Sequence, residues 1–233
     1  FATNLNENVD FVEMTVEEMA GIPEATLQRF KKLPNGKYKI QTKVNEYTQF
    51  MQSATNAAAR KKLAIAYDNR EAKTNTPLME EALKIRQEIA KLLGFKSWAD
   101  YRMKYKMAKK ASTAQTFLEG LKTKIAARNK KDLKDMLVLK KEMEPGSKEL
   151  FAWDTRFYDY QLKKKKYDLD EEIVREYFPA DFVVAQMFDI YSQLLGVKFV
   201  EVKGADVWAP GVKLYEIRDV KDDHFIANFY ADF

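Results

Sequence analysis

Apolar side chains recur at steps of three and four along most of this 233-residue chain, and this restricts it chiefly to amphipathic helices. One stripe ends just before Gly94 and another just before Gly196, and glycine readily adopts the left-handed conformation that ends many helices. We therefore predict that each stripe lies on a helix. The first comprises Leu78, Ala82, Ile85, Ile89 and Leu92, and the second comprises Phe182, Val183, Met187, Ile190, Tyr191 and Leu194.

Capping and breaking signals indicate further helices. Thr15 with Glu18, and Ser97 with Asp100, have the spacing of a capping box, which satisfies free amides at a helix start. Additional helices are predicted over residues 23–30, 44–53, 56–69, 112–143 and 153–164, and a short one capped by residues 168–171 ends before Pro179.

Strand signals are few. Residues 38–42 alternate in polarity and follow a turn at 33–36. Residues 197–202, 214–220 and 225–231 are also strand-like, and 221–223 resemble a hairpin turn. The predicted fold class is therefore mainly α: a multi-helix body with a small antiparallel β element near the C-terminal end.

Composition narrows the class of protein. A hydrophobic content of 46%, with 15 Phe and 12 Tyr, predicts a packed globular chain. The absence of Cys excludes disulfides, Cys-based zinc sites and a thiol nucleophile, and it is typical of a reducing compartment. We therefore expect a cytoplasmic protein. No apolar run is long enough for a bilayer and no signal peptide begins the chain, so we expect no membrane partner.

The net charge of +5 comes from interspersed Lys, Arg, Asp and Glu, which is typical of a solvated surface. The run Lys163–Lys166 is offset by acidic residues at 168 and 170–172, so we interpret it as a solvated helix end. A basic nucleic-acid-binding protein remains a distant alternative, and no nucleic-acid partner is expected.

Catalytic patterns are missing from the sequence. His224 is the single histidine, and with Asp222 and Asp223 it offers metal-ligand chemistry. These residues fall in the predicted hairpin turn, however, and a hydrolytic zinc site usually takes three protein ligands, mostly His, whereas this chain has one His and no Cys. We therefore interpret His224 as an exposed turn residue. No phosphate-binding glycine loop or nucleophile elbow is present.

Two other groups of side chains receive structural interpretations. The carboxylate pairs are expected at helix starts, where the positive end of the helix dipole stabilises negative side chains. The aromatic group around Trp153 is expected in a core. The pairs are Glu17-Glu18, Glu80-Glu81 and Glu171-Glu172, and the aromatic group is Phe151, Trp153, Phe157, Tyr158 and Tyr160. The residues by themselves thus predict no catalytic, cofactor-binding or metal-binding site.

Several segments follow one another in a distinctive order, among them residues 92–101 (L-L-G-F-K-S-W-A-D-Y), 152–158 (A-W-D-T-R-F-Y), 190–199 (I-Y-S-Q-L-L-G-V-K-F) and 229–233 (F-Y-A-D-F). This collinear set resembles the thimet oligopeptidase, neurolysin, oligopeptidase A and dipeptidyl carboxypeptidase family of zinc metallopeptidases. Each segment is a weak signal alone, but their order and spacing agree over nearly the whole chain.

The resemblance implies a neurolysin-like zincin fold with a deep channel for short peptides. Catalysis in this family uses H-E-x-x-H and a further Glu as zinc ligand, downstream of the segment resembling residues 229–233. We accordingly expect an internal fragment of a metallo-oligopeptidase that is inactive alone. Residues 1–150 would supply the helical body, and 151–233 a helical segment and hairpin leading into the zinc-binding region.

The same resemblance implies zinc as cofactor and short peptides as partners for the full-length family, with no cofactor in this chain. We also expect self-association through surface exposed by truncation. The alternative is a standalone, non-catalytic helical module that has kept this fold and binds peptides or proteins.

Overall fold

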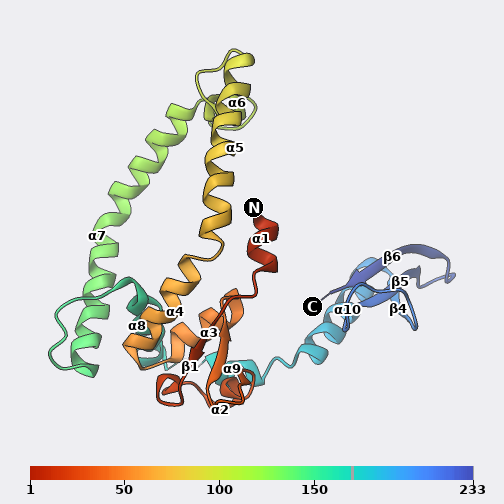
Figure 1. Ribbon diagram of the computed structural model, residues 1–233. Coiled ribbons are helices and arrows are strands. Elements are labelled where there is room, and N and C mark those ends of the chain that lie inside the picture. The colour runs from red at the N-terminus through yellow and green to blue at the C-terminus, as the bar shows by residue number, and fades with distance from the viewer. Residues whose placement is uncertain (169–170, 233) are drawn as a thin grey trace. The chain divides into compact units, whose positions relative to one another are not determined.

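The computed structural model describes residues 1–168 and 171–232 (Figure 1). The chain divides into two compact units, Phe1–Asp168 and Leu169–Phe233. Helices predominate, and antiparallel strands lie near the C-terminal end, so the predicted mainly α class is confirmed. The functional division at residues 150/151 stays a prediction. Among the described residues, no helix combines the length and apolarity needed to cross a bilayer.

A three-stranded antiparallel sheet lies in the first unit, in the order β1-β3-β2. Strand β3 (Tyr38–Gln41) confirms the prediction for residues 38–42, whereas β1 (Phe11–Met14) and β2 (Lys31–Lys32) were not predicted. Neither shows the clear alternation of β3 (Y-K-I-Q), because β1 begins with two apolar residues (F-V-E-M) and β2 consists of two lysines. They form because β3 pairs with both, which places Met14 and Ile40 in the core at 0% exposure.

The main core of this unit forms where the sheet meets α3 (Val44–Ser53) and α4 (Ala57–Asp68). Both helices confirm their predicted ranges, and Asn56 caps α4 by accepting a hydrogen bond from the Ala59 amide at 3.0 Å. The buried core residues are Met14, Met19, Phe30, Ile40, Tyr47, Phe50, Met51, Ala54, Ala59, Leu63 and Ala64.

Two short helices add to this core, the 3-10 helix η1 (Glu17–Met19) through Met19 and α2 (Glu24–Leu27) through Leu27. Helix α1 (Ala2–Glu7) has no buried residue, and its Asn4 amide donates to Asn75 Oδ1 at 2.9 Å. The capping box is confirmed, because the Glu18 amide donates to Thr15 Oγ1 at 3.3 Å and the Thr15 amide donates to Glu18 Oε2 at 2.8 Å. Helix α2 is shorter than predicted. The chain turns after Leu27, which brings Phe30 into the core.

The longest helices are α5 (Ala72–Leu92) and α7 (Ala111–Met143), joined through α6 (Trp98–Met103) (Figure 1). The stripe on α5 does mark a helix, yet Leu78 and Ile85 are 43% and 48% exposed. Glu80 and Glu81 lie inside α5, so their predicted place at a helix start is wrong. The helix extends about two turns N-terminal to them, because it begins at Ala72 rather than at the stripe.

Helix α8 (Thr155–Tyr167) follows the 3-10 helix η2 (Ala152–Asp154) and packs against α7 and α3. A smaller core forms there from Leu139, Phe157 and Tyr158. Phe157 and Tyr158 thus confirm the core interpretation of the aromatic group. Phe151 is 38% exposed and stacks on the half-buried Trp153 at a centroid distance of 4.7 Å.

The second unit contains α9 (Glu171–Glu176), α10 (Ala180–Leu195) and the antiparallel sheet β4-β5-β6. The strands are β4 (Val197–Val202), β5 (Lys213–Asp219) and β6 (Phe225–Ala231), which confirms all three predictions. Gly196 ends α10 with a φ of +68°. The predicted cap of α9 includes positions 169 and 170, which lie outside the described residues.

Gly21 tests how closely the chain packs around the main core. A Cβ there would lie 2.6 Å from the Ser53 carbonyl oxygen and from Thr55 Cγ2, whereas a Cβ on Gly36 would meet nothing within 4 Å. Both glycines have positive φ, so only the steric clash differs. We expect Gly21→Ala to lower the free energy of unfolding by about 1–3 kcal/mol more than Gly36→Ala. Urea denaturation measures this difference, and equal losses would contradict it.

Candidate functional site

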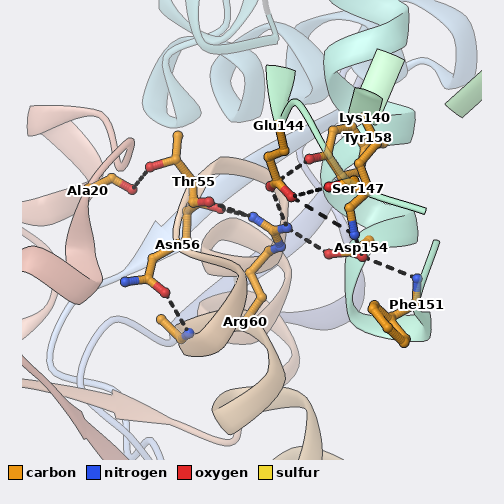
Figure 2. Close-up of polar contacts among 12 residues, drawn as sticks. Ala20, Thr55, Asn56, Arg60, Lys140, Glu144, Ser147, Phe151, Asp154 and Tyr158 are labelled. Atoms are coloured by element: carbon orange, nitrogen blue, oxygen red, sulfur yellow. Dashed lines mark hydrogen bonds and ion pairs between the residues drawn. The ribbon is translucent and has the colours of Figure 1, made fainter. Parts of the chain in front are cut away.

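The most deeply buried charged groups among the described residues gather where α4 meets η2 and where α7 meets α8 (Figure 2). Arg60 comes from α4, Lys140 and Glu144 from the C-terminal end of α7, Asp154 from η2 and Tyr158 from α8. Arg60, Asp154 and Tyr158 are 0% exposed and Lys140 is 4% exposed. We call these five residues the ionic cluster.

Asp154 lies at the centre of the ionic cluster. Its Oδ1 accepts a hydrogen bond from Arg60 Nη2 at 2.7 Å. Its Oδ2 accepts hydrogen bonds from Lys140 Nζ at 2.5 Å and from the Phe151 amide at 3.1 Å. One carboxylate therefore joins cations from two helices that are distant in sequence.

The remaining contacts complete the ionic cluster. Arg60 Nη1 donates to the Ala54 and Thr55 carbonyl oxygens at 2.7 and 3.0 Å, and the guanidinium lies 4.3 Å from the ring centroid of Phe157. The Tyr158 hydroxyl donates to Glu144 Oε1 at 2.7 Å. Two carboxylates thus balance two cations, and Figure 2 shows these side chains pointing toward one another.

The electrostatics of the ionic cluster favour a structural role. Burial alone would raise the pKa of the Asp154 carboxyl, but hydrogen bonds from Lys140, Arg60 and the Phe151 amide hold that pKa below its ordinary value. Burial, together with the hydrogen bond to Glu144, raises the pKa of the Tyr158 hydroxyl well above its usual range. General acid–base catalysis needs a group that titrates near the working pH, and neither of these groups does.

Sequence reasoning missed the ionic cluster. Arg60 and Asp154 are 94 positions apart, so no local spacing connects them. The available signal was indirect: Trp153 and Asp154 belong to a segment that carries the family resemblance, where an acidic residue stands inside an aromatic group.

His224 is exposed beside the turn between β5 and β6, as the sequence predicts. Its Nδ1 lies 2.6 Å from Asp222 Oδ1, and this contact raises the pKa of the imidazole. Asp223 turns instead to Lys198 Nζ at 2.8 Å. The ligand atoms that do gather, within 4.8 Å of one another, belong to Asp219, Asp222 and His224.

This trio does not fit a hydrolytic zinc centre. Such a centre takes three protein ligands, mostly imidazoles, and leaves one position open to water. Here one imidazole already shares its Nδ1 with a carboxylate, and both Asp222 and His224 are exposed. The chain has no second histidine and no cysteine with which to complete the set.

The lysine run 163–166 lies at the C-terminal end of α8, with residues 164–166 in its last turn, and is solvated, as predicted. Neutralising partners come from α7, because Lys165 Nζ lies 2.5 Å from Glu142 Oε2 and Lys166 Nζ lies 3.1 Å from Asp135 Oδ2. These ion pairs reduce the charge available to a phosphate backbone.

A groove of about 510 Å³ follows one face of α10. Its lining is almost wholly apolar and contains no charged side chain. The lining residues are Phe178, Phe182, Val183, Gln186, Met187, Ile190, Tyr191 and Leu194. This groove has the character of a packing surface rather than of a reaction site, since its polar side-chain groups are one amide and one hydroxyl and no charged side chain lines it.

Comparison with known proteins decides the family. The family model for peptidase family M3 matches residues 50–233. The chain belongs to peptidase family M3. The resemblance carried by the quoted segments is therefore confirmed.

Several M3 relatives match this chain over most of its length. The chain is 32% identical to a thimet-like oligopeptidase of Dictyostelium discoideum and 30% identical to saccharolysin of Saccharomyces cerevisiae, with all of its own length aligned. It is 30% identical to oligopeptidase A of Escherichia coli over 92% of its length. It covers 36%, 35% and 33% of these proteins, or about a third of each.

Removal of the central carboxylate tests the ionic cluster. Asp154→Asn leaves Arg60 and Lys140 buried with one carboxylate fewer, so we expect the free energy of unfolding to fall by about 3–5 kcal/mol. The matched control is Asp132→Asn, which breaks the exposed 2.9 Å pair with Arg128 and should cost about 1 kcal/mol or less. Urea denaturation compares the two variants, and a similar loss in both would contradict this role for Asp154.

The lowered pKa of Asp154 predicts a direction for the pH dependence. A carboxyl with a depressed folded-state pKa stabilises the fold fully above its unfolded value of 3.8, and this contribution is lost as the pH falls through the folded value. The stability difference between the wild-type chain and Asp154→Asn should therefore shrink as the pH is lowered from 6 toward about 3. Urea midpoints across this range provide the measurement, and a constant difference would contradict the prediction.

Proposed function

We propose that this chain is the non-catalytic helical portion of a zinc-dependent M3 oligopeptidase that hydrolyses short peptides. The observation that carries the proposal is the M3 match over residues 50–233, in a chain whose own donor set does not fit hydrolytic zinc. Zinc in such enzymes supplies a bound water whose pKa is about 7. The ligands for it would come from polypeptide outside the matched stretch.

The contribution of this chain is scaffold and channel wall. Residues 1–150 supply the helical body, and 151–233 supply the helical segment and hairpin that lead toward the zinc-binding region. The ionic cluster supports this role, since its buried ion pairs stabilise the junction of α4, η2, α7 and α8. A reducing, cytoplasmic location agrees with the absence of cysteine.

A second function is a non-catalytic binding module built on the same fold. The apolar groove on α10 favours it, because an uncharged groove lined by aromatic and aliphatic side chains suits an apolar helix. This alternative predicts binding by the 233-residue chain alone, with no gain of activity in a longer protein.

Peptide hydrolysis by the purified chain tests the proposal. We expect no cleavage of an internally quenched peptide and no stoichiometric zinc by elemental analysis, with E. coli oligopeptidase A as the active control. The variant His224→Ala guards against a hidden site, because it removes the single imidazole. Cleavage that copurifies with the chain and disappears in His224→Ala would refute an inactive scaffold.

A further inference from the structure

Helix α10 is apolar on two opposite faces. On the inner face, Phe188 packs on the sheet of its own unit, with ring centroids 4.7 Å from Phe199, 4.7 Å from Tyr215 and 6.2 Å from Phe229. This contact explains one apolar face of the helix and leaves the opposite one without a partner in its own unit.

The outer face of α10 consists of two parallel ridges at steps of four residues. One ridge is formed by Phe182, Gln186, Ile190 and Leu194, and the other by Val183, Met187 and Tyr191. Phe182, Ile190 and Leu194 are 59%, 54% and 74% exposed. The groove of about 510 Å³ is lined by these ridges and by Phe178.

The apolar character of the outer face indicates which kind of partner it binds. No charged side chain lines the groove, and its side-chain polar groups are the Gln186 amide and the Tyr191 hydroxyl. Contiguous exposed apolar surface of this kind is typical of a contact site. The regular ridges and the groove between them suit the surface of a second helix, which favours protein as the cover.

We propose that the outer face of α10 packs against polypeptide that M3 relatives carry beyond the stretch matched here, through an uncharged apolar helix. This proposal rests on the proposed function and deepens it. All of this chain aligns with the Dictyostelium and yeast proteins, yet it covers only 36% and 35% of them. About two-thirds of each relative is thus available to provide the partner.

Geometry and size favour a helix as the partner. Two i, i+4 ridges with a groove between them accept the corresponding ridge of a second helix at an interaxial angle of about −50°. Aromatic side chains bury about 150–250 Å² each, so this face exposes several hundred Å², approaching the roughly 800 Å² per partner of a standard interface. A free peptide is less suited, since the groove offers no charged group for its termini.

Cysteine accessibility tests the proposal, because the chain has no native cysteine. Ile190→Cys reports on the outer face, and Lys221→Cys in the exposed β5–β6 turn is the control. Each variant is made in the 233-residue chain and in hybrids where this chain replaces the matched stretch of the Dictyostelium or yeast relative. Maleimide labelling is followed by mass spectrometry of the peptide that contains the variant position.

We expect both variants to label at similar rates in the dilute 233-residue chain. In a folded hybrid, labelling of Ile190→Cys should slow by about tenfold or more, while that of Lys221→Cys stays unchanged. Fast labelling of Ile190→Cys in the hybrid overturns the proposal. So does slow labelling in the dilute chain alone, which means that the chain covers this face itself.

Further outcomes of the labelling experiment also test the proposal. Protection in the 233-residue chain that appears only at high concentration, without protection in a hybrid, identifies a second copy as the occupant and overturns the proposal. Failure of both hybrids to fold, when the relatives themselves fold, also counts against it. Peptidase activity of the hybrid is measured separately: an active hybrid with fast labelling refutes only this inference, and an inactive one with protection refutes only the proposed function.

Discussion

The buried carboxylate of Asp154 is the interaction on which the packing of α4 against the α7–α8 region depends. It accepts hydrogen bonds from Arg60 and Lys140, two cations that are almost wholly removed from water. Burying such charges is costly unless a counter-charge and further hydrogen bonds compensate for the lost hydration. Glu144 provides the second negative charge, so the ionic cluster is balanced and holds its residues in one arrangement.

The same chain exposes apolar surface elsewhere, on the stripe of α5 and on the outer face of α10. An ordinary monomer seldom exposes contiguous apolar patches of this kind without a function for them. In an M3 family member that matches about a third of each relative, such faces have a simple physical meaning. Under the proposed function they are packing surfaces of a larger helical body, whereas the buried charges of the ionic cluster are already paired within this chain.

Interactions between residues close in sequence made much of the fold predictable. Helix α3 spans the predicted residues 44–53, and the capping box at Thr15 and Glu18 forms as its spacing indicates, because capping involves atoms only three residues apart. Strands β1 and β2 were missed, since they lack a clear alternation of apolar and polar residues and acquire their conformation from pairing with β3. The position of Glu80-Glu81 was misjudged, because α5 begins before its apolar stripe does.

The sequence by itself determined the helical class, the exposed turn position of His224 and, through collinear segments, the peptidase family. These features depend on neighbours along the chain or on residue order, so they can be predicted without the tertiary structure. Only the tertiary structure brought Arg60 to Asp154 across 94 positions and decided which apolar stripes are buried. Long-range contacts of this kind follow from how whole helices pack, and the local spacing of residues in the sequence does not predict them.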